Sequence, residues 1–137
     1  DHAPHPMAEK RRESVWETSP GFPGLETSMR LMLTQVANGR LTLQDYVRMA
    51  CEAPARAFGL WPRKGALLVG ADADLVLLDL DHRETVRGSS FQSLGKVTPF
   101  EGMETQGRAA MTFLRGKLVA QEGRLVASPG VGRPVAR

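Results

Sequence analysis

The apolar pattern of this chain changes its period near Leu60, and this change limits the folds that the chain can adopt. From Leu25 to Ala37 apolar side chains recur every three or four residues, which predicts an amphipathic helix ending at an Asn-Gly pair. Thr42, with Asp45 three residues later, predicts the start of a second helix. After Leu60 the apolar runs are short and separated by Gly-containing turns, which predicts strands. Helices followed by strands indicate the end of one domain joined to part of another.

The second helix has an apolar face that includes Cys51. Since Cys51 is the only cysteine, no intrachain disulfide can form, and we expect a buried structural thiol there. Pro54 predicts that this helix ends and that a separate short turn follows, stopped by Gly59.

Three short apolar runs predict strands, and two Gly-containing pairs predict tight hairpin turns between the last of them. The strands are expected at Leu75–Asp79, Ala110–Leu114 and Lys117–Ala120, and the turns at Arg115-Gly116 and Glu122-Gly123. His82 lies in a polar stretch between these runs, which favours a surface turn.

The chain begins with Asp1-His2-Ala3-Pro4-His5, and the next 19 residues are rich in Pro and Gly. In a (β/α)₈ barrel, functional residues lie where a strand ends and its loop begins. Asp1 would then end the last strand, residues 6–24 would form its loop, and residues 25–37 would be the closing helix. We therefore expect an α/β fold in which residues 1–60 are the C-terminal end of a TIM barrel and residues 61–137 contribute strands to a second domain.

Composition excludes several function classes. The net charge of +3 is spread along the chain, and the run Lys10-Arg11-Arg12 is too short to indicate nucleic-acid binding. No apolar run approaches the roughly 20 residues that span a bilayer, and we expect no signal peptide from the pattern of the first residues. We expect a cytoplasmic protein that acts on a small molecule, without a nucleic-acid or membrane partner.

Residues 1–5 together with Lys10 resemble the second signature motif of dihydroorotases. The run Pro20-Gly21-Phe22-Pro23-Gly24-Leu25-Glu26-Thr27 is similar to the substrate loop and helix start that follow this motif in that family. Residues 54–60, 64–65, 70–76 and 98–102 resemble segments common to cyclic amidohydrolases. The similarity extends over essentially the whole chain, which we expect to be the C-terminal part of such an enzyme. The resemblance implies that residues 61–137 form the C-terminal strands and tail of a small β-sandwich domain.

The resemblance implies reversible, zinc-dependent hydrolysis of the cyclic amide of dihydroorotate to N-carbamoyl-aspartate in pyrimidine biosynthesis, with one or two zinc ions. Asp1 matches the aspartate that ligates the metal and carries a proton during catalysis. His5 matches the residue that contacts the substrate carboxylate, and Pro20 and Gly21 match positions whose backbone meets the substrate. Lys10 is expected to be a solvated or loop-stabilising lysine, and His2 is not assigned as a ligand.

The chain also departs from the family pattern, because it has no His-x-His pair and only three histidines. A catalytic zinc usually needs about three protein ligands, and Asp1 supplies one, so we expect the isolated chain to be inactive. Two alternatives stay open. One is a hydantoinase or allantoinase, and the other is a non-catalytic partner of aspartate carbamoyltransferase. A homo-oligomer, or a complex with that transcarbamoylase, is expected.

Overall fold

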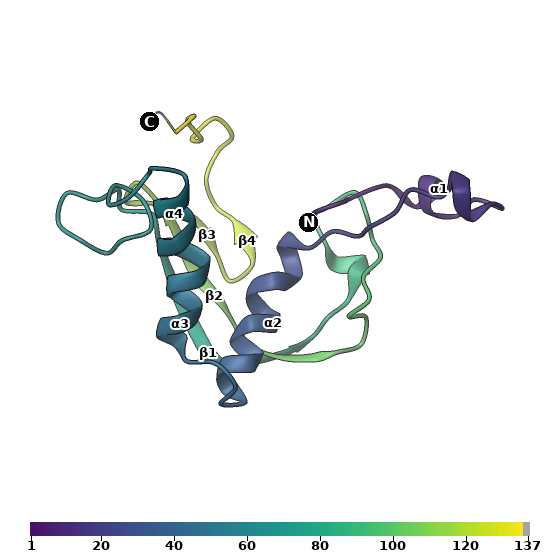
Figure 1. Ribbon diagram of the computed structural model, residues 1–137, viewed down its shortest axis with the longest axis horizontal. Coiled ribbons are helices and arrows are strands. Elements are labelled where there is room, and N and C mark those ends of the chain that lie inside the picture. The colour runs from purple at the N-terminus through teal and green to yellow at the C-terminus, as the bar shows by residue number, and fades with distance from the viewer. Residues whose placement is uncertain (136–137) are drawn as a thin grey trace.

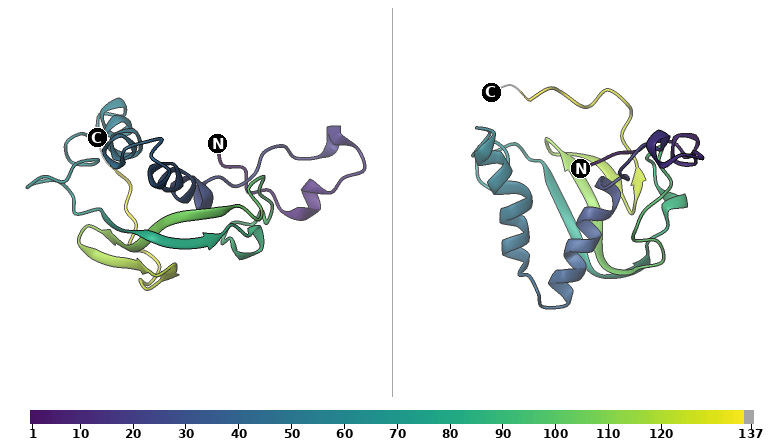
Figure 2. Two further views of the ribbon diagram at one scale, coloured as in Figure 1. Left: turned by 90° about the horizontal axis from the view of Figure 1, so that it is seen from below. Right: turned by 45° about the vertical axis from the view of Figure 1, so that its right-hand side comes forward.

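The computed structural model describes residues 1–135, in which helices lie on one side of a four-stranded antiparallel sheet (Figures 1 and 2). The segment that carries the first two short helices projects away from the sheet. The elements in order are α1 (Met7–Lys10), η1 (Val15–Glu17), α2 (Leu25–Ala37), α3 (Leu43–Val47), η2 (Arg48–Glu52), α4 (Ala53–Ala57), β1 (Leu75–Thr85), η3 (Gly88–Ser90), β2 (Glu104–Leu114), β3 (Lys117–Gln121) and β4 (Arg124–Leu125).

Helix α2 has the bounds that its apolar spacing predicts, and it packs against β2. Leu33, on the face of α2 that meets the sheet, is only 1% exposed. Gly107 in β2 has φ +92°, and a Cβ built there would lie 2.7 Å from the Cβ of Leu33. A glycine at position 107 therefore lets helix and strand approach closely.

The second helix starts as predicted, because the Thr42 hydroxyl accepts the Asp45 N–H at 3.1 Å. The prediction of a separate turn at Pro54 was wrong, since α3, η2 and α4 follow one another without a break. Element η2 is a π-helical turn in which the Ala53 N–H reaches the Arg48 carbonyl. This wider turn lies just before Pro54, whose ring would crowd the carbonyl four residues earlier in a regular helix.

Cys51 is exposed, so the prediction of a buried thiol was also wrong. Cys51 lies within the π-helical turn, where the hydrogen bonds span five residues instead of four. The extra residue rotates the side chains relative to a regular helix. Exposure is not confined to this turn, however, since Val47 and Ala50 of the same predicted apolar face are exposed as well.

The sheet is a simple meander with the order β1-β2-β3-β4. Both predicted hairpin turns are confirmed, with positive φ at Arg115 and Gly116 and again at Glu122 and Gly123. Strands β1 and β2 are longer than their apolar runs predict, and their pairing is irregular between Asp79 and Arg83.

His82 lies in this irregular part of β1, and the expected surface turn was wrong. The Asp79 carboxylate accepts the N–H groups of Asp81 and His82, which stabilises a local bulge within the strand. The polar residues that suggested a turn therefore form a bulge, because β2 continues to pair on both sides of it.

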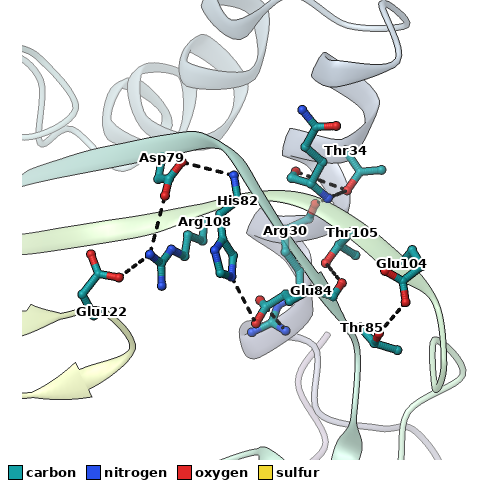
Figure 3. A network of polar contacts seen from close by, with 11 residues as sticks. Arg30, Thr34, Asp79, His82, Glu84, Thr85, Glu104, Thr105, Arg108 and Glu122 are labelled. Atoms are coloured by element: carbon teal, nitrogen blue, oxygen red, sulfur yellow. Dashed lines mark hydrogen bonds and ion pairs between the residues drawn. The ribbon is translucent and has the colours of Figure 1, made fainter.

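Polar contacts also join α2 to the sheet (Figure 3). The Arg30 guanidinium lies 2.9 Å from the Glu84 carboxylate, and the Gln106 N–H donates to the Thr34 hydroxyl at 2.9 Å. These contacts cross the expected domain boundary at residue 60, which stays a prediction. Within residues 1–135, no helix has the length and apolar character that a bilayer span requires.

Candidate functional site

Residues 1–3 lie beside residues 21–24, so the two ends of the N-terminal loop meet. The Ala3 N–H donates to the Phe22 carbonyl at 3.0 Å. A Cβ built at Gly21, which has φ +79°, would lie 2.6 Å from the Ala3 Cβ, and one built at Gly24 would lie 2.7 Å from the Asp1 carbonyl oxygen. The two glycines permit this close approach of backbone to backbone.

The Asp1 backbone lies beside Gly24, the residue that precedes α2, and its carboxylate bonds to the next residue. Its Oδ1 accepts the His2 N–H at 2.7 Å, and the residue is exposed. The His2 Nδ1 accepts the N–H groups of Gly24 at 3.2 Å and Leu25 at 3.3 Å. Gly24, the N-cap residue of α2, has no side chain to accept such groups, so the His2 ring takes the place of a capping side chain.

His5, just before α1, pairs with Glu9 within that helix. The His5 Nδ1 lies 2.9 Å from the Glu9 Oε2, which also accepts the Ser19 hydroxyl at 3.3 Å. Both His5 and Glu9 are partly exposed. With Nδ1 facing Glu9, the Nε2 atom on the opposite edge of the ring is the one that can meet a ligand.

Lys10 closes the loop by donating to the carbonyls of Ser19, at 2.7 Å, and Gly21. The expectation of a loop-stabilising lysine is confirmed. Pro20 lies between these two carbonyls and is exposed, as is Gly21. Since Lys10 binds the Gly21 carbonyl, the structure holds the backbone of Pro20 and Gly21 in one conformation beside residues 1–3.

The segment between β1 and β2, which is distant in sequence, packs against this loop through Gly95 and Phe100. Phe100 meets Phe22 edge to face, with ring centroids 6.0 Å apart. Gly95 lies so close to His5 that a Cβ built on Gly95 would be 3.0 Å from the His5 carbonyl oxygen.

Glu26, in the first turn of α2, forms hydrogen bonds with the same segment between β1 and β2. Its carboxylate accepts the N–H groups of Gln92 and Ser93, both at 2.8 Å, and the Ser93 hydroxyl at 2.6 Å. Burial raises the pKa of Glu26, but the hydrogen bonds from Ser93 and Gln92 outweigh it, and the pKa lies below its ordinary value. Sequence reasoning missed this role, because an acidic residue in the first turn of a helix is also a common dipole partner.

The residues present fit one ligand position of a metal centre and not a complete one. Asp1 offers an exposed carboxylate oxygen, whereas the Nδ1 of His2 binds backbone N–H groups and the Nδ1 of His5 faces Glu9. In the part of the chain that the structure covers, no three His, Cys, Asp or Glu side chains converge to hold a metal ion. A centre with about three protein ligands would need residues from outside this chain.

Comparison with known proteins connects this geometry to one family. The model of the amidohydrolase family matches residues 11–119. An L-hydantoinase of Paenarthrobacter aurescens is 45% identical over 140 aligned residues, which cover 100% of this chain and 31% of that protein. A dihydroorotase of Methanothermobacter thermautotrophicus is 42% identical, covering 95% of this chain and 30% of that protein.

Solved structures agree with the sequence comparison. The L-hydantoinase (dihydropyrimidinase) from Arthrobacter aurescens superposes with a TM-score of 0.86 at 46% identity, covering 91% of this chain and 28% of that one. The similarity to dihydroorotases that the motifs predict is confirmed, and similarity to hydantoinases is equally clear. The chain spans about three tenths of the length of these relatives.

Proposed function

The chain belongs to the amidohydrolase family, and on this basis we propose that it is the C-terminal part of a metal-dependent cyclic amidohydrolase that acts on dihydroorotate. In the reaction, water adds to the ring amide carbonyl, the carbon–nitrogen bond breaks, and the nitrogen takes up a proton to give N-carbamoyl-aspartate. The reverse reaction closes the ring and releases water.

Asp1 is the residue of this chain that would carry the proton transfer. Its Oδ1 is held by the His2 N–H, and its exposed carboxylate can accept a proton from the attacking water and pass it to the leaving nitrogen. A zinc centre, with one ion or two, lowers the pKa of bound water to about 7. Asp1 would be one of its ligands, and the others would come from outside residues 1–137.

His5 is the observation that favours dihydroorotate as the substrate. Since Nδ1 faces Glu9, the Nε2 edge of the His5 ring is the one turned to a ligand, and an imidazole N–H at this edge would suit the carboxylate of dihydroorotate. The backbone of Pro20 and Gly21, held by Lys10, would contact the same substrate.

The proposal also includes the domain architecture, the cellular location and the assembly of the whole protein. Residues 1–60 would complete a (β/α)₈ barrel, and residues 61–137 would contribute strands to a small β-sandwich domain. The high structural similarity to a hydantoinase over 91% of the chain supports this arrangement. A cytoplasmic homo-oligomer, alone or with aspartate carbamoyltransferase, is the assembly we propose.

A hydantoinase is the second candidate function, and a specific observation favours it. The L-hydantoinase relative aligns with the entire chain at 45% identity, which is slightly more than the dihydroorotase relative. Both enzymes would open a cyclic amide, so they differ in the groups that surround the ring.

Substrate assays with the full-length protein and its His5→Ala variant test the choice. We expect turnover of dihydroorotate, and a KM for it raised on the order of tenfold in the variant, because the imidazole that would contact its carboxylate is lost. Turnover of a hydantoin without a carboxylate should not respond to the substitution. If the wild type opens hydantoins and leaves dihydroorotate intact, the second candidate is correct.

A further inference from the structure

The segment between β1 and β2 forms a closed loop, which we name the 88–101 loop. At its neck the Val86 N–H donates to the Met103 carbonyl and the Gly102 N–H to the Val86 carbonyl, both at 2.9 Å. Inside the neck, the Gly88 N–H donates to the Glu101 carboxylate at 2.7 Å. Since Val86 and Phe91 are buried, the loop has a defined conformation rather than an open one.

Glu26 fastens this loop to α2. Its two carboxylate oxygens accept three donors from Gln92 and Ser93, so both backbone N–H groups at the tip of the loop are bonded to one side chain. Bonds from N–H and O–H groups to a carboxylate are among the stronger hydrogen bonds in proteins. These hydrogen bonds to Glu26 therefore fix the position of residues 92 and 93 relative to the start of α2.

Two residues further along, the loop reaches the candidate site. Gly95 is buried, and a Cβ built on it would lie 3.2 Å from the Pro4 Cα and 3.0 Å from the His5 carbonyl oxygen. Figure 1 shows this loop, in teal and green, beside the N-terminal segment. The backbone of His5 therefore packs against the 88–101 loop, and Glu26 bonds to this same loop.

We propose that Glu26 is a positioning residue for His5, which it supports through Ser93 and Gly95. The proposal rests on the proposed function, in which His5 contacts the substrate carboxylate, but the contacts that carry it are independent of the substrate. Glu26 itself touches no reacting group. Its effect should therefore appear in substrate binding and in the order of residues 2–5, rather than in the chemical step.

The test uses the full-length protein with Glu26→Gln. Glutamine keeps one acceptor oxygen but turns an NH₂ group toward an N–H donor, so the bonds to Gln92 and Ser93 cannot all form. By hydrogen exchange with mass spectrometry, we expect faster exchange in peptides covering residues 92–96 and also in those covering residues 2–5, where the Ala3 N–H is bonded to Phe22. We expect KM for dihydroorotate to rise roughly tenfold with kcat changed less than about twofold.

Glu84→Gln is the matched control, because Glu84 also joins α2 to the sheet, through Arg30, but has no contact with the loop (Figure 3). It should leave both exchange at residues 2–5 and KM unchanged. Faster exchange at residues 92–96 alone, with residues 2–5 and KM as in the wild type, would overturn the proposal.

If the wild type does not open dihydroorotate, the proposed function fails, and exchange at residues 2–5 still decides the role of Glu26. If Glu26→Gln does not fold, Gly95→Ala tests the same support from the other side. Its Cβ would press on the His5 carbonyl, so exchange at residues 2–5 and KM should both change. Unchanged exchange and KM in a folded Gly95→Ala protein would contradict the proposal.

Discussion

His2 and Lys10 lie inside the motif that the sequence singles out, yet both side chains bind backbone atoms. His2 accepts two N–H groups at the start of α2, and Lys10 donates to two carbonyls of the same loop. Both therefore hold the conformation in which Asp1 and His5 are presented. Asp1 is the motif residue whose carboxylate remains open to solvent.

Replacing Asp1 tests its catalytic role at the residue scale. In the full-length protein, Asp1→Asn should lower kcat by about 10²- to 10⁴-fold, because an amide cannot accept the proton of the attacking water. Circular dichroism should be unchanged, since the exposed carboxylate contributes little to packing. Asp81→Asn, an exposed aspartate in the β1 bulge, is the control and should keep full activity. Turnover of Asp1→Asn near the wild-type rate would exclude the proton-transfer role.

At the scale of elements, the contact between α2 and β2 places the site. The site lies at the start of α2, so the close packing of this helix on β2 sets where Asp1 and the loop lie relative to the sheet. The contact depends on Leu33 of the helix and Gly107 of the strand, which lie 74 positions apart in the chain. Local sequence patterns predict each element, but they do not predict that these two residues meet.

Gly107→Ala tests this contact. The substitution places a Cβ 2.7 Å from Leu33 at a φ of +92°, so it combines a steric clash with backbone strain. We expect it to lower the free energy of unfolding by about 2 kcal/mol or more. Gly123→Ala is the control, because Gly123 also has positive φ but nothing within 4 Å of its Cβ position. Thermal or denaturant unfolding of the full-length variants should show the smaller loss for Gly123→Ala, and equal losses would contradict the packing argument.

At the scale of the molecule, the solvent-accessible surface area is larger than that of a typical folded monomer of the same mass. The accessible surface is 9635 Å², whereas a folded monomer of 15.0 kDa has about 7,000 Å². Large apolar side chains contribute to the difference, including Trp16 at 94% exposed, Leu67 at 84% and Leu125 at 83%. Surfaces of this kind are typically covered by other protein.

Residues 1–137 expressed alone should therefore self-associate and bind a dye such as anilinonaphthalene sulfonate, because many of their large apolar side chains are exposed to solvent. Size-exclusion chromatography and dye fluorescence would measure both effects. The full-length protein is the control and should bind less dye per molecule. An isolated chain that runs as a monomer and binds no dye would contradict this expectation.

The candidate site was predictable in part. The motif residues Asp1, His5, Pro20 and Gly21 are recognisable from their order alone, and the structure brings them into one loop. The role of Glu26 could not be recognised in this way, although Glu26 lies in the run that resembles the substrate loop and helix start. Its donors lie 66 and 67 positions further along the chain, and no local pattern connects them.

The sequence by itself determined the features that depend on neighbours within about four residues: the bounds of α2, the Thr42 cap and the two hairpin turns, whose backbone angles are set by local side chains and glycines. Only the tertiary structure decided the features that depend on distant partners. It placed His82 in a bulge because β2 pairs on both sides of it, and it coupled Glu26 to His5 through the 88–101 loop. Side-chain identity sets local conformation, whereas the packing of helix on sheet sets which distant groups meet.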